Sequence, residues 1–350
     1  MFLYIYMCSV SFNTLNLKYN LSFSSNKKQN QLSPAEDVIR AFKEKELKDM
    51  KGSWYNKDGN PTASIPLLLP LVYTIYSVIK VKKIKKILPQ KEFSKKNKQY
   101  IRDIILSFLA GCMGTYGLNS YFTSKTDENY KEICSKFNKM NTQTDAVLAE
   151  QPLNSNYIGG FCYPASGVIA LSKMYVNDPI YKKKAEKILK HELVHARQYE
   201  TVARSKDGIK KLNYAVLYNI KRVAQNDQDT RDSFEQTYRD IKNNFEKYKD
   251  VKIKLSPTVE VNLAKFIEAS YILLTNPNAG IHDIPIVIDE KHYQKVIDKK
   301  GPLSPSEEAR ADLYYKAMIA YPQIGPMEVF NKNSSYYQNI LEREAYATTM

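Results

Sequence analysis

The sequence predicts an α+β fold that is mostly helical. Signals for the start of a helix recur along the chain, at residues 33–36, 177–179, 256–260 and 304–308. Strand patterns are few and short, at residues 168–171 and 284–288. A hydrophobic content of 43% over 350 residues is enough to build a substantial core, in one large domain or two small ones.

The composition limits the classes of partner. The formal net charge is +15, which suits an acidic partner such as a nucleic acid. The lysines are spread along the chain, however, and no zinc-finger, helix-turn-helix or RNA-binding signature accompanies them, so we do not expect nucleic-acid binding. The four cysteines have no C-x-x-C spacing, which argues against a second metal site.

The N-terminal region, residues 1–63, is expected to carry one amphipathic helix. Residues 1–31 are expected to be poorly ordered. The sequence Ser33-Pro34-Ala35-Glu36 is a capping box, and it predicts a helix that runs to about Met50.

The next region, residues 64–122, has the pattern of a helical hairpin. Two apolar runs, at 64–81 and 104–122, flank a highly basic loop at 82–102. A membrane-spanning helix needs about 20 apolar residues, so we expect a transmembrane hairpin, with the basic loop in the cytoplasm and the rest of the chain on the other side. The alternative is a pair of buried helices in a cytoplasmic protein.

The domain at residues 123–350 contains the most informative motif, His191-Glu192-Leu193-Val194-His195. On a helix, two histidines four residues apart lie on one face, so both imidazoles can bind one metal ion. The glutamate between them is placed to accept a proton from a metal-bound water. The chain has only four histidines, so two of them at this spacing are unexpected by chance.

A long helix is predicted around this motif. Asn177 or Asp178 can cap it, and Pro179 suits the first helical position. No proline or glycine interrupts the chain from 181 to 204, so the motif is expected near the middle of a rigid helix. The short strand at 168–171 precedes it, and this strand is either an exposed edge that pairs with an extended peptide or an ordinary core strand.

A catalytic zinc site needs a third protein ligand. A nearby third histidine is excluded, because position 198 is Gln and position 201 is Thr, which also argues against the metzincin class. The best source is the stretch 341–347 near the C-terminus, where Glu342 and Glu344 are rivals. They are two residues apart on a predicted helix, so only one of them is expected to face the metal.

The H-E-x-x-H motif, followed far downstream by E-x-x-A, resembles the gluzincin metallopeptidases. The most similar groups are the membrane-associated CAAX-protease and heat-shock-protease type and the small repressor-cleaving gluzincins. The resemblance implies a zincin-like domain with a small edge-strand sheet, Glu342 as the third zinc ligand, and Ala345 as the small residue that lets two helices approach. The family often has Asp or Asn four residues after the glutamate ligand, and Tyr346 stands there instead, either orienting a ligand histidine through its hydroxyl or packing.

These observations predict a zinc-dependent endopeptidase that acts on peptide or protein substrates. His191, His195 and Glu342 would bind zinc, and Glu192 would act as general base. An oxyanion stabiliser is also expected, and the candidates are His282, His292, Tyr271, Tyr314 and Arg310. One alternative is a membrane-anchored, metal-stabilised binding or regulatory module without catalysis, and another is an interaction protein with a chance motif.

Overall fold

The computed structural model describes residues 32–51, 79, 90, 102, 126–153, 159–177, 179–224, 228–256, 259–321 and 335–349. The described parts of 1–51 and 133–350 belong to one compact unit, and those of 52–132 belong to a second. The first unit is mostly helical with two small sheets, which confirms the predicted α+β class. The expectation of poor order for 1–31 falls outside the described residues.

A three-stranded sheet lies beside the motif helix. Its strands are β1 (Val147–Leu148), β2 (Gly160–Tyr163) and β3 (Val168–Leu171), in the order β1-β3-β2. Strand β3 is parallel to β1 and antiparallel to β2, with Cys162 opposite Ile169. The β2–β3 turn ends at Gly167, whose φ of +65° is in the left-handed region that favours glycine.

The predicted strand at 168–171 is therefore a core strand and not an edge strand. It hydrogen-bonds on both sides, and Ile169, Ala170 and Leu171 are fully buried. The structure therefore supports the core alternative, and the sequence could not decide because the two-residue strand β1 that pairs beside β3 leaves almost no pattern. Among the described residues, β2 pairs with β3, and it contacts the motif helix.

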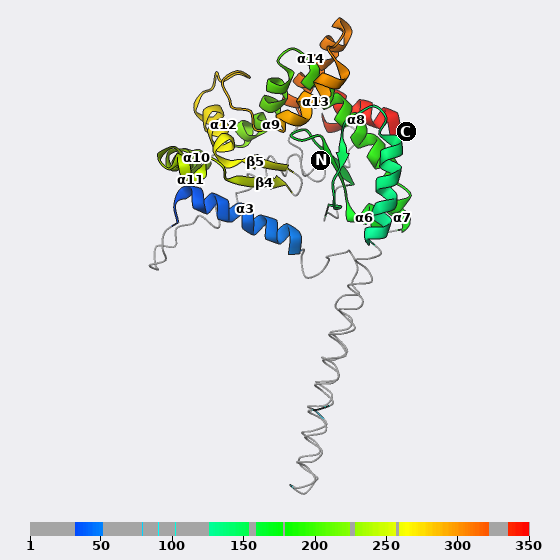
Figure 1. Ribbon diagram of the computed structural model, residues 1–350, viewed down its shortest axis with the longest axis horizontal. Helices are drawn as coiled ribbons and strands as arrows, with labels where there is room; N and C mark the ends of the chain where they lie inside the picture. Colours follow the sequence, from blue (N-terminus) through cyan, green and yellow to red (C-terminus); the bar gives the residue numbers. More distant parts are fainter. Residues whose placement is uncertain are drawn as a thin grey trace. The chain divides into compact units, whose positions relative to one another are not determined.

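The motif lies on α8 (Ala185–Arg204), the central helix of this unit. It packs against β2 and β3 on one side and against several helices on the others (Figure 1). The single helix predicted from Pro179 is divided, because α7 (Pro179–Lys182) ends two residues before α8 begins. A short helix, α6 (Lys173–Asn177), precedes both.

The helices that follow α8 in the described chain are α9 (Gly208–Ala224), α10 (Gln228–Asn243), α11 (Phe245–Tyr248), α12 (Leu263–Thr275), α13 (Glu290–Lys300), α14 (Pro305–Ile319), α15 (Ser335–Gln338) and α16 (Ile340–Thr349). Helices α9, α13, α14 and α16 contact α8 directly. The strand expected at 284–288 is absent, and that described segment is irregular.

The helix predicted after the first capping box is confirmed as α3 (Pro34–Lys51). It packs against α10 and against β4 (Lys252–Ser256), which forms a hairpin with β5 (Val259–Asn262). The backbone N–H of Ala35 donates to Asp240, and the Ser33 hydroxyl hydrogen-bonds to Tyr248. These bonds attach the start of α3 to the same compact unit as α8.

The expectation of a transmembrane hairpin, and with it a membrane location, needs correction. In the part of the chain that the structure describes, no helix is both long and apolar enough to cross a membrane. The most apolar of the described helices is α12, and its 13 residues fall short of the roughly 20 that a span requires. The two runs at 64–81 and 104–122 lie, apart from Ile79, outside the described residues.

Candidate metal centre

Helix α8 brings His191 and His195 together. They are one turn apart, and the Nε2 atoms of the two rings are 3.1 Å apart. Both residues are buried, with relative exposures of 9% and 6%. The two imidazoles therefore point at a common position, as the motif spacing predicts.

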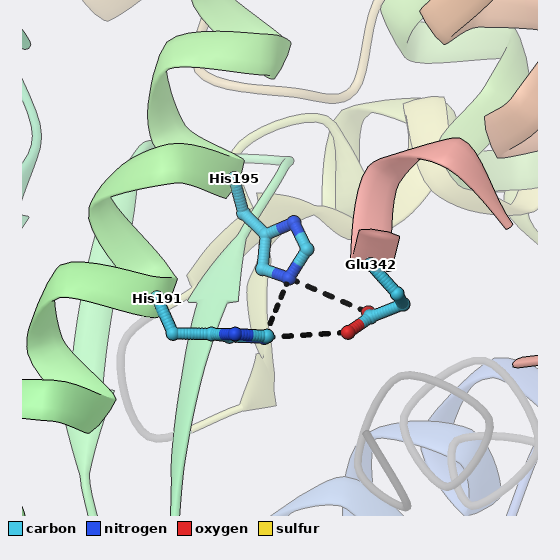
Figure 2. A group of neighbouring side chains, drawn as sticks. All are labelled: His191, His195 and Glu342. Carbon is cyan, nitrogen blue, oxygen red and sulfur yellow. Dashed lines mark hydrogen bonds and ion pairs between the residues drawn. The ribbon is translucent and has the colours of Figure 1, made fainter. Parts of the chain in front are cut away.

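Helix α16 supplies Glu342 to the same position. Its Oε2 lies 3.3 Å from Nε2 of His191, and its Oε1 lies 3.4 Å from Nε2 of His195 (Figure 2). Helix α16 packs on α8, and its residues Leu341 and Ala345 are buried, Ala345 fully. A small side chain at 345 suits this close contact between the helices.

Glu344, the rival ligand, faces a different set of partners. Its carboxylate accepts hydrogen bonds from Arg310 and from the hydroxyl of Tyr314, each at 2.6 Å, and one from Gln198 at 3.2 Å. Two residues along a helix correspond to a rotation of about 200°, so the two carboxylates cannot share one site. The structure places Glu342, and not Glu344, beside the histidines.

The three side chains fit a divalent metal ion. Their ligand atoms all lie within 4.8 Å of one another. Nitrogen and oxygen ligands of a tetrahedral zinc ion are about 3.3 Å apart, close to the separations here. Within the described residues, the buried Oε2 of Glu342 has no hydrogen-bond partner, and a cation would satisfy it. Two imidazoles and a carboxylate suit zinc and also other transition metals.

Without a metal, the negative charge of Glu342 and the imidazoles of His191 and His195 attract one another. Burial lowers the pKa of His195, but the charge of Glu342 and hydrogen bonding to it outweigh this effect and raise the pKa to about 9. Burial raises the pKa of Glu342, and the two histidines lower it, so that it lies well below its ordinary value. A proton and a metal ion would therefore compete for His195.

Glu192 lies between α8 and strand β2. It is 7% exposed, and a Cβ atom added to Gly160 would lie 3.2 Å from its Cγ. Burial, followed by the charge of Glu192, raises the pKa of the Cys162 thiol on the same strand. The charge of Glu192 also contributes to the raised pKa of His195. Its carboxylate is therefore close to both the sheet and the metal-binding group.

Three further side chains contact the group, and the roles of Tyr321 and Gln198 among them were not predicted. The hydroxyl of Tyr321 donates to Oε1 of Glu342 at 2.5 Å. Gln198 accepts a hydrogen bond from Nδ1 of His195 at 2.9 Å. The ring of Tyr346 lies edge-on to His191 with centroids 4.6 Å apart, which favours the packing alternative.

Of the two that were not predicted, only Gln198 carries a signal in the sequence. Gln198 is three residues after His195 and therefore lies on the same helical face. Tyr321 approaches through the tertiary fold, which local patterns do not encode. The five oxyanion candidates interact elsewhere: His282 with Lys210, His292 with Tyr293, Tyr271 with Tyr238, and Arg310 and Tyr314 with Glu344.

No family model, no curated protein and no solved structure matches this chain.

Proposed function

We propose that this protein is a zinc-dependent endopeptidase. The observation that carries the proposal is the buried group of His191, His195 and Glu342, whose ligand atoms lie within 4.8 Å of one another. Its two histidines belong to an H-E-x-x-H motif, so a potential general base, Glu192, lies on the same helix as these two histidines. The resemblance to gluzincins rests on the same residues and supports the same assignment.

In this proposal, each residue has a separate task. Nε2 of His191, Nε2 of His195 and the carboxylate of Glu342 would hold the ion, and the hydroxyl of Tyr321 donates a hydrogen bond to one oxygen of that carboxylate. When bound, zinc supplies a Lewis acid that lowers the pKa of water and polarises a peptide carbonyl. The carboxylate of Glu192 accepts a proton from the attacking water and passes it to the nitrogen of the leaving amine.

The decisive experiment is the substitution Glu192→Gln. The amide has nearly the same shape but cannot accept the proton, so cleavage of labelled casein should fall about 10²–10⁴-fold. Zinc content, measured by elemental analysis, should stay at one ion per chain, because Glu192 is not a ligand. Cleavage at the wild-type rate by this variant would overturn the proposal.

The burial of the group favours one competing function. His191, His195 and Glu342 are each less than one tenth exposed, and a metal ion that no substrate can reach would have only a structural role. The protein would then be a metal-stabilised binding or regulatory module. Such a module binds zinc but cleaves neither casein nor a peptide library, so the wild-type protein alone distinguishes the two functions.

A further inference from the structure

Gln198 lies directly behind the metal-binding group and is fully buried. Its amide nitrogen donates to the carbonyl oxygen of Leu341 at 3.1 Å and to Oε2 of Glu344 at 3.2 Å. Its amide oxygen lies 2.9 Å from Nδ1 of His195. All the polar capacity of this side chain is therefore directed at His195 and at helix α16.

These bonds determine which nitrogen of His195 carries the proton. The two acceptors on α16 require the NH₂ group of Gln198 to face them, which turns its oxygen toward His195. That oxygen can only accept, so Nδ1 of His195 must be the protonated nitrogen. In the neutral ring, Nε2 then presents its lone pair toward His191 and Glu342, as metal binding requires.

Glu344 is itself held in place by residues of α14. The guanidinium of Arg310 donates to Oε1 of Glu344, and the hydroxyl of Tyr314 donates to Oε2, each at 2.6 Å. Arg310 also donates to the hydroxyl of Tyr314 at 2.6 Å. The amide of Gln198 is thus oriented by a carboxylate that has its own charged partner.

We propose that Gln198 is a positioning residue that presents Nε2 of His195 to a divalent cation, with Glu344 and Arg310 fixing the orientation of its amide. The proposal rests on the metal site of the proposed function and deepens it. It also assigns different tasks to the two rival glutamates, because Glu342 binds the ion and Glu344 holds the residue that orients His195. Both glutamates lie on α16, so the packing of α16 against α8 positions the metal ligand Glu342 and the anchor of Gln198, Glu344, together.

The test is the affinity for zinc of the full-length variant Gln198→Met, measured by competition with a chromogenic chelator. Methionine keeps the volume and removes the acceptor, so the affinity should fall about 10–100-fold. The matched control is Asn213→Leu, which removes another buried amide, one that binds the backbone of residues 285 and 287. The control should lower the melting temperature and leave the zinc affinity unchanged.

A second variant extends the test beyond the loss seen in Gln198→Met. If Gln198→Met fails to fold, the zinc affinity of this second variant is compared with wild type instead and should lie within about tenfold of it, a larger loss overturning the proposal. The double substitution Gln198→Glu with Glu344→Gln retains an acceptor facing His195 and exchanges the charges of the two side chains. Its zinc affinity should exceed that of Gln198→Met, and its cobalt form should keep the wild-type absorption bands. An affinity no higher than that of Gln198→Met, or a Gln198→Met affinity within twofold of wild type, overturns the proposal.

The affinity measurement separates this proposal from the proposed function. A wild-type protein that binds no zinc overturns both. The positioning role needs no cleavage, so its own failure is seen in a Gln198→Met protein that binds zinc as wild type does.

Discussion

Glu342 and Glu344 show how strongly the position of a residue on a helix determines its partners. Both are acidic and both precede an alanine by three residues, so the local sequence does not separate them by chemistry. Their partners do: Glu342 is 3% exposed and lies beside two imidazoles, while Glu344 is paired with Arg310. The same side chain is a candidate metal ligand at one position and a partner of Arg310 at the other.

The two glutamates lead to opposite expectations for metal content. Glu342→Gln replaces the proposed carboxylate ligand, of charge −1, with a neutral amide. The purified variant should therefore contain much less than one zinc ion per chain. Glu344→Gln keeps an acceptor for Gln198 and should retain about one zinc per chain, with an affinity lowered by no more than about 10–100-fold. Elemental analysis after dialysis measures both, and loss of zinc from Glu344→Gln alone would reverse the assignment.

The raised pKa of His195 predicts how the stability of the metal-free protein depends on pH. The folded-state pKa is about 9, above the ordinary value of 6.5, so the protonated ring stabilises the fold fully below about pH 6.5. This contribution is lost as the pH rises through 9. The depressed pKa of Glu342 adds a contribution above its ordinary value of 4.5 that is lost on acidification.

Melting temperatures of chelator-treated protein test this dependence. Wild type should lose stability between pH 6.5 and 9, because His195 gives up its proton in that window. Glu342→Gln lacks the negative partner and should show a shallower slope over the same window. Equal slopes in the two proteins would show that the pair is not the source of the pH dependence.

At the scale of elements, local start signals located helices better than they located strands. The capping box at Ser304 is present and opens α14, as predicted. The signal at 256–260 was misleading, because the chain there forms the β4–β5 hairpin and α12 begins only at Leu263. Ile253 and Val261 are buried opposite each other in that hairpin, and this pairing outweighs the local signal.

The contact between α8 and β2 depends on the missing side chain of Gly160. A Cβ atom there would lie 2.6 Å from Cγ2 of Ile188 and 3.2 Å from Cγ of Glu192. Gly160→Ala should therefore push the strand from the helix and reduce the free energy of unfolding by about 1–3 kcal/mol. It should also slow casein cleavage, since Glu192 is displaced.

The matched control for this substitution is Gly280→Ala. A Cβ atom at Gly280 would lie 3.7 Å from its nearest neighbour, an ordinary van der Waals contact. Its free energy of unfolding should stay within about 0.5 kcal/mol of wild type. Urea denaturation measures both variants, and equal stability of the two would show that β2 is not tightly packed on α8.

At the scale of the whole molecule, the sequence could predict only those parts of the site that depend on local patterns. The two histidines follow from helical periodicity, and Glu342 was favoured by its resemblance to a motif. Gln198 and Tyr321 escaped, because their roles depend on how α16 and the end of α14 approach α8. The choice between an edge and a core position for β3 stayed open for the same reason, since it depends on a partner strand of two residues.

A metal that joins two helices should stabilise the entire unit. Zinc bound only by the folded protein, at a free concentration 100 times its dissociation constant, adds about 2.7 kcal/mol to the free energy of unfolding. The melting temperature of wild type should therefore rise with zinc, and that of Glu342→Gln should not. A similar rise in both proteins would place the stabilising metal elsewhere.

Glu342 lies far after the H-E-x-x-H motif in the chain, so the parts of the site are synthesised at different times. The ribosome releases α8 with both imidazoles and Glu192 well before it releases α16. A nascent chain at that stage has two ligands, which hold zinc poorly, and it lacks the groups on α16 that orient His195. Under the proposed function, the unfinished polypeptide is latent, and hydrolysis becomes available only after the intervening helices have emerged and α16 has docked.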